Sequence, residues 1–245
     1  MIRTIPKPPK PAQRADTDSA SNCTFFSPRG EIRVPGTVFS LAGFRAWAKS
    51  DDLPENVGVT FVDKQVIIDM SGEEIQAHVL VKTAIYGGLF PLIAETDRGI
   101  MCFGGTLVSN ESANVSNIPE GVFVSWESLE AGRARLVRDD DDPERYLEIE
   151  GSPDWVLEIV SNSSVAKDTR LLRKAYHRAG ISEYWLVDAR GDNLDFKILV
   201  HRAAGYEPAA ERGGWQRSEV FGHRFKLERK RGRLGLWQYR LHVKK

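Results

Sequence analysis

Residues 153–188 constrain this chain most, because two acids stand there inside an otherwise apolar run. The run begins Pro-Asp-Trp-Val-Leu-Glu-Ile-Val-Ser, which predicts a buried strand that contains Asp154 and Glu158. Side chains alternate across a strand, so Asp154, Val156, Glu158 and Val160 share one face. Burying a carboxylate costs free energy unless a metal, a cation or hydrogen bonds compensate for it. The acids therefore indicate a functional site, and a metal site accounts for them.

The composition is that of a folded protein. With 245 residues, 41% of them hydrophobic, the chain can form one large domain or two small ones around a substantial core. We expect no membrane helix, which needs roughly 20 apolar residues, and no signal peptide. Cys23 and Cys102 are the only cysteines, and the apolar setting of Cys102 favours a free thiol over a disulfide. These features together predict a cytoplasmic protein without a membrane partner.

The net charge of zero hides an uneven distribution of charge. Residues 111–158 contain 13 acids and four bases, whereas residues 216–245 contain 10 bases and two acids. A basic segment can bind phosphates even when the total charge cancels, although a solvated C-terminal end has the same composition. The candidates for nucleic-acid binding are Arg224, Lys226, Arg229, Lys230, Arg231 and Arg233.

The chain divides into a tail and one folded unit. Residues 1–34 carry prolines, basic residues and small polar residues, which predicts a disordered tail. We expect a single mixed α/β domain over residues 35–240. It should begin with a helix over 40–49 and a hairpin over 57–70 that turns at Asp63-Lys64.

Two further helices are expected. Ser71-Gly72-Glu73-Glu74 matches a capping box and predicts a helix whose end is weakened by Gly87-Gly88 and Pro91. The apolar face of this helix should consist of Ile75, Val79, Tyr86 and Leu89. A second helix over 165–179 should end at Gly180. The predicted strands lie at 100–108, 121–125, 134–137, 146–150, 155–160, 184–187, 196–200 and 215–227. Strand, helix and strand across 155–187 indicate a right-handed crossover in a partly parallel sheet.

The residues of this region also follow a known order. They read Pro-Asp-x3-Glu-x-Val-Ser at 153–161, Asp168, Tyr-x2-Ala-Gly-Ile at 176–181 and Glu-Tyr-Trp-Leu-Val-Asp at 183–188. This order resembles the Uma family of bacterial restriction-endonuclease-like proteins, within the PD-(D/E)xK nuclease-like superfamily, and the similarity extends from about 37 to 226. The resemblance implies an α/β fold with a restriction-endonuclease-like core, in which helices flank a central mixed β-sheet, here with additional antiparallel hairpins. It also implies a magnesium-dependent site that hydrolyses phosphodiester bonds.

The resemblance implies Glu120 and Glu158 as catalytic metal ligands. In the superfamily one acid, often preceded by proline, lies on the strand before the (D/E)xK strand. Pro119-Glu120 matches that place, with Glu where Asp is usual. Glu158 matches the acid of the (D/E)xK element itself. The expected metal is magnesium, which manganese could replace.

The catalytic lysine is absent from both positions where the resemblance expects it. Val160 stands at the lysine position of the (D/E)xK element. Leu172 stands at the helix position from which the Uma family draws a lysine instead. Lys167, nearest the site end of the helix, is the first substitute, and Arg173 and Lys174 are reserves.

Several polar residues have competing interpretations. Glu74 could add a fourth polar group to the site or only complete the capping box with Ser71. Asp154 could support the site or only cap the turn at the entry of its strand. The acidic run at 139–144 predicts a solvated hairpin turn, and His78 should pack beside the apolar stripe rather than act in catalysis. The histidines and cysteines show no zinc-ligand spacing.

Two functions remain open at this point. One is a magnesium-dependent endonuclease that acts on nucleic acid, with DNA preferred, as a homodimer, because a double-strand cut needs two active sites. The other is a catalytically degenerate nuclease-fold protein that binds nucleic acid or another protein. Glu at position 120 and the missing lysines favour the second, whereas Glu158 with Lys167 nearby favours the first. A sugar or small-molecule hydrolase is disfavoured, because the chain has neither a nucleophile elbow nor a glycine-rich phosphate loop.

Overall fold

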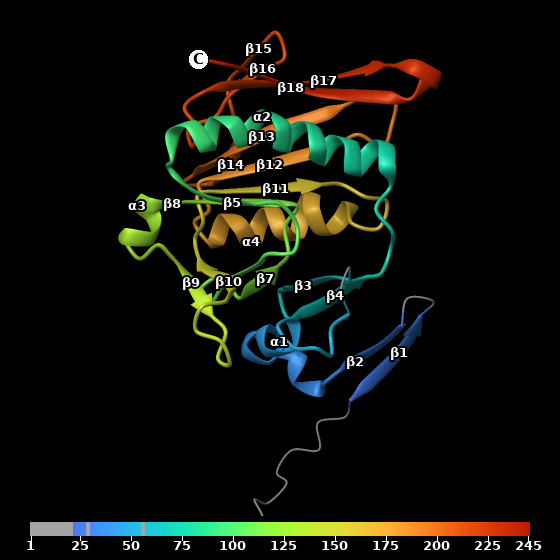
Figure 1. The fold of residues 1–245 in the computed structure, drawn as a ribbon, viewed down its shortest axis with the longest axis vertical. Helices are drawn as coiled ribbons and strands as arrows, with labels where there is room; N and C mark the ends of the chain where they lie inside the picture. Colours follow the sequence, from blue (N-terminus) through green and yellow to red (C-terminus); the bar gives the residue numbers. More distant parts are fainter. Residues whose placement is uncertain (1–21, 28–29, 55–56) are drawn as a thin grey trace, which may run out of the picture.

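The computed structural model describes residues 22–27, 30–54 and 57–245 (Figure 1). The α-helices are α1 (Leu41–Ala48), α2 (Leu80–Thr96), α3 (Trp126–Glu130) and α4 (Arg173–Arg178). The strands are β1 (Cys23–Ser27), β2 (Gly30–Val34), β3 (Gly58–Val62), β4 (Gln65–Asp69), β5 (Gly99–Cys102), β6 (Leu107–Asn110), β7 (Val115–Asn117), β8 (Gly121–Ser125), β9 (Ala134–Arg138), β10 (Tyr146–Gly151), β11 (Trp155–Ile159), β12 (Glu183–Asp188), β13 (Asp195–Arg202), β14 (Gly205–Pro208), β15 (Glu211–Arg212), β16 (Trp215–Arg217), β17 (Arg224–Arg231) and β18 (Trp237–Lys244). Two π-helical segments, Ile75–Val79 and Lys167–Leu172, directly precede α2 and α4.

A central mixed sheet has the strand order β14-β13-β12-β11-β8-β5. β11 and β12 are parallel and are joined through α4, as predicted, while the other neighbours are antiparallel. Because side chains alternate across β11, Val156 packs in the same cluster as α4, and Leu157 packs in the same cluster as α2. The central sheet is thus covered by a helix on each face, which confirms the predicted fold class.

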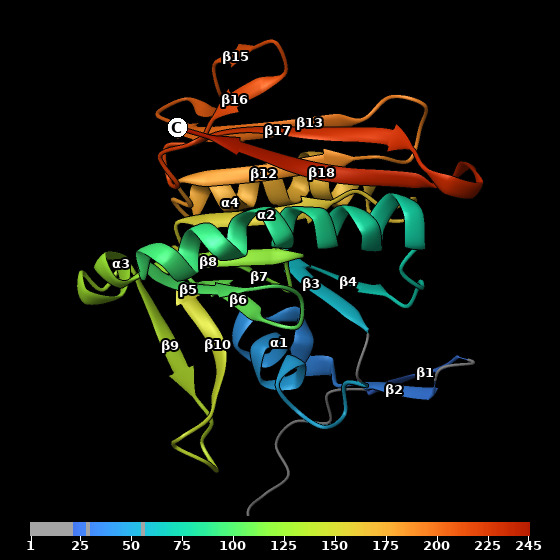
Figure 2. The same ribbon diagram turned by 45° about the horizontal axis from the view of Figure 1, so that its top comes forward.

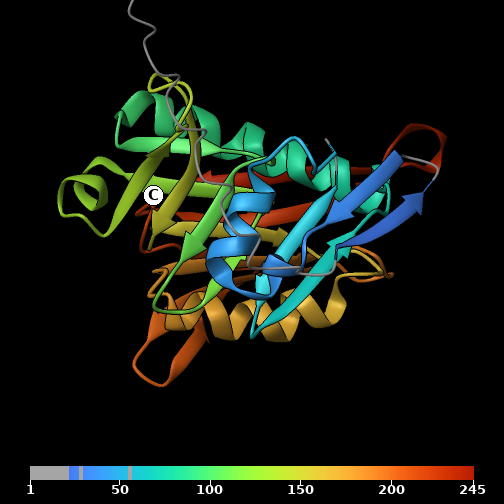
Figure 3. The ribbon, with the colours of Figure 1, turned by 90° about the horizontal axis from the view of Figure 1, so that it is seen from below.

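Two further large sheets pack around the central sheet and its helices. The order β4-β3-β7-β6-β10-β9 forms a second mixed sheet, whose core with α1 contains Phe44, Trp47 and Phe61. The β1–β2 hairpin projects beside β3 and β4 (Figure 3). The C-terminal sheet β15-β16-β17-β18 lies over α2 (Figure 2). A Cβ on Gly88 would come within 2.8 Å of a Leu241 methyl group, so Gly88 allows α2 and β18 to approach closely.

The helix over 75–96 differs from its prediction in its start and in its buried face. Glu74, rather than Ser71, accepts the capping hydrogen bonds, and the helix continues through Pro91 to Thr96. Ile75 and Tyr86 are 67% and 42% exposed. The buried face instead consists of Val81, Ile85, Leu89 and Ile93. A π-helical turn contains one residue more than an α-turn, so the residues that follow it are rotated about the axis.

The predicted strand over 100–108 is wrong as a single element. Gly104 and Gly105, with φ near +70°, divide it into β5 and β6, which belong to different sheets. The predicted strand over 215–227 is likewise two strands, β16 and β17. The folded body also begins earlier than residue 35, since Ile32 and Val34 are buried. Residues 1–21 of the predicted tail lie outside the described residues.

Several local predictions are confirmed. The turn of the β3–β4 hairpin is Asp63-Lys64, with φ of 50° and 62°. The buried residues of the helix over 165–179 include Leu172, Ala175 and Tyr176, and the acidic run at 139–144 forms the turn between β9 and β10.

The expectation about membrane helices needs correction. The helical stretch Ile75–Thr96, of 22 residues, is long and apolar enough to cross a membrane by length and composition alone. In this fold it covers one face of the central sheet.

Candidate functional site

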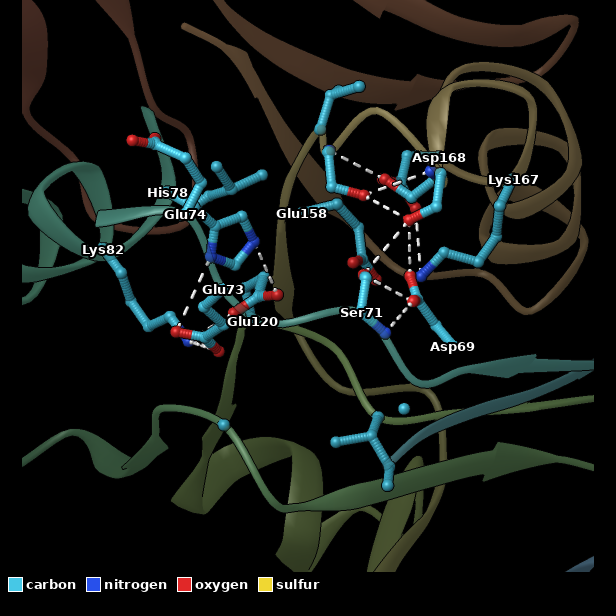
Figure 4. A pocket seen from close by; sticks show the side chains of 18 of the residues that line it. Asp69, Ser71, Glu73, Glu74, His78, Lys82, Glu120, Glu158, Lys167 and Asp168 are labelled. Carbon is cyan, nitrogen blue, oxygen red and sulfur yellow. Dashed lines mark hydrogen bonds and ion pairs between the residues drawn. The ribbon is translucent and has the colours of Figure 1, made fainter. Parts of the chain in front are cut away.

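A cavity of about 1240 Å³ lies where β8, β11 and the two π-helical segments meet (Figure 4). Glu120, Glu158 and Lys167 all line this cavity. β8 and β11 are antiparallel, and their ladder ends with Gly121 opposite Leu157. Glu120 and Glu158 are the next residues along the two strands at this end, where the Glu120 N–H donates to the Leu157 carbonyl and the regular register stops. Residues far apart in the sequence thus bring two acids and a lysine to one cavity.

Glu158 is buried and accepts hydrogen bonds from two neutral side chains. The residue is 2% exposed. Its Oε1 accepts hydrogen bonds from Asn117 Nδ2 at 2.8 Å and from the Tyr176 hydroxyl at 2.6 Å. Burial raises the pKa of Glu158 to about 8, although the Lys167 ammonium lowers it, and the charge of Asp168 raises it further. Burial therefore favours the protonated form of this carboxyl group.

Lys167 and Asp168 begin the π-helical segment beside Glu158. The Lys167 ammonium lies 3.2 Å from Asp168 Oδ1, and Asp168 is 1% exposed. Burial lowers the pKa of Lys167, but the charges of Glu158 and Asp168 outweigh that effect and raise it. The Ser164 hydroxyl donates to Asp168 Oδ2, while Oδ1 receives no well-aligned hydrogen bond within the described part of the chain. Lys167 is therefore a buried, charged ammonium close to the two acids.

Glu120 is held by two cationic partners instead. His78 Nε2 lies 3.0 Å from Oε1, and the Lys82 ammonium lies 2.7 Å from Oε2. Burial raises the pKa of Glu120, but His78 and Lys82 together lower it to about 2. Lys82 also lies 2.7 Å from Glu73 Oε1. Glu120 is therefore ionised throughout the physiological pH range.

His78 and Lys82 were not expected at the site. His78 is buried, as predicted, and it also contacts Glu120. Both residues line the cavity. Their i, i+4 spacing on an otherwise apolar helix is the signal that could have revealed them, because such residues are neighbours on one helix face. Asn117 and Tyr176, which hold Glu158, gave no comparable signal.

Other predicted site residues have structural roles. Glu74 accepts hydrogen bonds from the backbone of Gln76 and Ala77, so it caps the π-helical segment at the rim of the cavity. Asp154 lies at the other end of β11, where it accepts hydrogen bonds from Ser125 N and Ser128 Oγ, both at 2.7 Å.

The positions of the missing lysines and of their reserves are also clear. Val160 and Leu172 are 1% and 0% exposed in the core cluster that contains α4. Arg173 donates to the Tyr206 carbonyl at 2.8 Å, and Lys174 is exposed on α4. Among the described residues that line the cavity, neither reserve is found.

The basic C-terminal candidates follow β17 and the turn to β18. They are Arg224, Lys226, Arg229, Lys230, Arg231 and Arg233. Arg229 and Arg231 stack on the Trp237 ring, at 4.2 and 3.6 Å from its centroid. Arg229 also donates to the Ala189 carbonyl at 3.0 Å. Since Trp237 and Ala189 line the cavity, this basic strand reaches the cavity rim.

One solved structure and one family model are similar to this chain. A solved structure described as "a putative nuclease belonging to DUF820", from Anabaena variabilis ATCC 29413, is 16% identical, with 75% of this chain and 90% of that chain covered and a TM-score of 0.49. No curated protein matches the chain. The family model of Uma2, described as "Putative restriction endonuclease", matches residues 43–229. Because that match spans well over half of the sequence, the chain belongs to the Uma2 family.

Proposed function

We propose that this protein is a metal-dependent endonuclease that hydrolyses the phosphodiester bonds of DNA. Membership of the Uma2 family supports a nuclease that acts on nucleic acid. One observation carries the finer proposal: Glu120 and Glu158, at the same end of two neighbouring strands, line one cavity together with Lys167.

The donor set of the cavity fits a divalent cation. Carboxylate oxygens are the protein ligands that magnesium prefers. Buried Asp168 Oδ1, without a well-aligned hydrogen bond in the described structure, adds negative potential beside them. We propose that Glu120 and Glu158 hold magnesium, and that manganese can replace it. When bound, such an ion lowers the pKa of a coordinated water and neutralises charge on the phosphate.

The protein's own residues have separate tasks in this proposal. Lys167 supplies a fixed positive charge for the phosphorane-like transition state, which carries more negative charge than the substrate. Asn117 and Tyr176 hold Glu158 in one orientation through hydrogen bonds of 2.8 and 2.6 Å. His78 and Lys82 keep Glu120 ionised. Each of the two acids is therefore held in place by neighbouring side chains.

The basic strand β17 supports DNA as the substrate. Arg229, Arg231 and Trp237 form a charged, aromatic edge beside the cavity. Lys230 and Arg233 are exposed on the same segment and can contact phosphates. We further propose a homodimer, because one cavity cuts one strand and a double-strand break needs two.

The proposal is tested by the variant Glu158→Gln. It keeps the shape of the side chain but removes the charge that the cation needs. We expect wild-type protein to nick supercoiled plasmid in magnesium or manganese and Glu158→Gln to show no cleavage, while the exposed-acid control Glu95→Gln stays active. Single-stranded substrates are assayed in parallel. Equal cleavage by wild type and Glu158→Gln would contradict the proposed site.

A second function is favoured by a specific observation. The two lysine positions of the family pattern hold packed Val160 and Leu172, so the usual catalytic cation is absent there. On this alternative the protein is a degenerate nuclease that binds nucleic acid or another protein without cutting. DNA binding that persists in Glu158→Gln, with no cleavage by wild type under any of the metal conditions, would support it.

A further inference from the structure

We propose that Glu73, His78 and Glu120 form a binding site for a divalent transition-metal cation at the edge of the cavity. One potential ligand atom from each residue lies within 4.8 Å of the others. This inference rests on the proposed function in one respect: Glu120 belongs both to this site and to the proposed magnesium site with Glu158. It names the class of cation for this part of the cavity, and cation binding can be measured without any nuclease assay.

His78 provides the strongest evidence for the site. The residue is 7% exposed, and its Nε2 lies 3.0 Å from Glu120 Oε1. Its Nδ1 has no hydrogen-bond partner among the described residues and lies 3.7 Å from Glu73 Oε2. Leaving a buried polar atom without a partner is costly. When Nε2 donates its proton to Glu120, Nδ1 presents a lone pair, which is the arrangement that metal-binding histidines use.

Lys82 indicates where the cation would bind. Its ammonium lies 2.7 Å from Glu73 Oε1 and 2.7 Å from Glu120 Oε2, so the two carboxylates converge on one cationic position. With His78 as the neutral imidazole, two carboxylates and one ammonium leave a net negative charge, which a divalent cation would neutralise more completely. The Lys82 side chain is 19% exposed and can turn toward solvent when a cation replaces it. Lys82 therefore competes with the metal for this position.

The imidazole determines the class of metal. Magnesium prefers oxygen ligands, whereas imidazole nitrogen favours manganese, cobalt and zinc. Glu158, with its two neutral hydrogen-bond donors, belongs to the carboxylate side of the cavity and is not part of this ligand group. We therefore expect the histidine site to bind Mn²⁺ and Zn²⁺ more tightly than Mg²⁺.

The test measures Mn²⁺ binding to the full-length protein by calorimetry and by pulsed electron paramagnetic resonance. We expect the wild-type spectrum to show ¹⁴N coupling from imidazole. His78→Gln should remove that coupling and weaken binding by about tenfold or more. Lys82→Met, which removes the competing ammonium, should strengthen Mn²⁺ binding. The exposed-acid variant Glu95→Gln, on the same helix, should bind as wild type does.

The outcomes separate this inference from the proposed nuclease. If His78→Gln binds Mn²⁺ like wild type while Glu158→Gln does not, the cation uses Glu120 and Glu158 alone. That result overturns the histidine site and leaves the nuclease proposal intact. Absence of ¹⁴N coupling in both wild type and Lys82→Met overturns it as well. If His78→Gln fails to fold by circular dichroism, Glu73→Gln at the exposed side of the site replaces it, and unchanged Mn²⁺ affinity in that variant overturns the inference. Plasmid cleavage in magnesium tests the nuclease separately.

Discussion

The pKa values of Glu120 and Glu158 are shifted in opposite directions, although both residues line one cavity, because their neighbours differ. Glu158 accepts hydrogen bonds from the neutral side chains of Asn117 and Tyr176. Burial is the largest influence on its pKa, which rises to about 8. His78 and Lys82 offer Glu120 positive charge, and its pKa falls to about 2. In the proposed metal site Glu120 would therefore already be charged, whereas Glu158 would release a proton when a cation binds.

This difference predicts a pH-dependent affinity for magnesium. Below pH 8 a proton on Glu158 competes with the ion, so the apparent Kd should fall about tenfold for each pH unit between 6 and 8 and then level off. Calorimetry in two buffers of different ionisation enthalpy measures both the Kd and the proton released. An affinity that stays constant from pH 6 to 9 would contradict the role of Glu158 as a ligand.

The same pKa predicts how the stability of the metal-free protein depends on pH. The pKa of Glu158 is raised from its ordinary value of 4.5 to about 8 on folding, so the folded state binds the proton more tightly than the unfolded state. The free energy of unfolding should therefore fall as the pH rises from 4.5 to 8. Glu158→Gln lacks this loss and should gain a few kcal/mol over wild type at pH 9 relative to pH 4. Urea denaturation of both proteins at these two pH values gives the comparison, and equal differences would disprove it.

Sequence reasoning proposed Glu120, Glu158 and Lys167, which line one cavity, but it did not propose their partners. The acids are recognisable because charged residues next to apolar strands are uncommon. The i, i+4 spacing of His78 and Lys82 places them on one helix face, but only the tertiary fold brings Glu120, about 40 positions later in the chain, to them. Their own helix resembles an ordinary amphipathic helix with a capping box.

At the scale of elements, both helices that reach the cavity begin with a π-helical turn. Ile75–Val79 carries His78, and Lys167–Leu172 carries Lys167 and Asp168. π-helical turns are rare and often occur at functional sites, because the extra residue redirects side chains. The sequence pattern assumes a regular 3.6-residue period, so it predicted the wrong buried face for the helix over 75–96.

The close contact of α2 with β18 gives a prediction for two adjacent glycines. A Cβ on Gly87 would meet nothing within 4 Å, so Gly87→Ala should stabilise the helix by about 0.5–1 kcal/mol. A Cβ on Gly88 would come within 2.8 Å of Leu241, so Gly88→Ala should cost about 1–3 kcal/mol through overpacking. Urea denaturation measures both. Equal stabilisation by the two variants would show that α2 and β18 are not in close contact.

At the scale of the molecule, the central crossover was predictable, but the division of the chain among its sheets was not. Asp154 and Glu158 on one face of a strand, and the helix end at Gly180, are local signals. They predicted β11, α4 and β12 correctly. β5 and β6 read as one apolar strand, and only the two glycines with positive φ between them separate the sheets. The basic C-terminal segment was evident from its composition, whereas its return to the cavity depends on contacts such as Arg229 with Ala189.

The position of this basic segment leads to a prediction about DNA binding. Arg229 is committed to backbone carbonyls and Trp237, whereas Lys230 and Arg233 are exposed and free to contact phosphates. Replacing both with Gln should reduce the slope of log affinity against log salt concentration by about 2, because each phosphate contact contributes roughly 0.9. Sequence preference should not change, since phosphate contacts carry no base information.

Fluorescence anisotropy of a labelled duplex between about 50 and 250 mM salt measures this slope, over a range in which such contacts dominate affinity. The matched control is Lys174→Gln, because Lys174 is exposed on α4, which packs on the opposite face of the central sheet from β17. The control should keep the wild-type slope. If the double variant also keeps it, β17 is only solvated surface, and DNA must approach the cavity from another side.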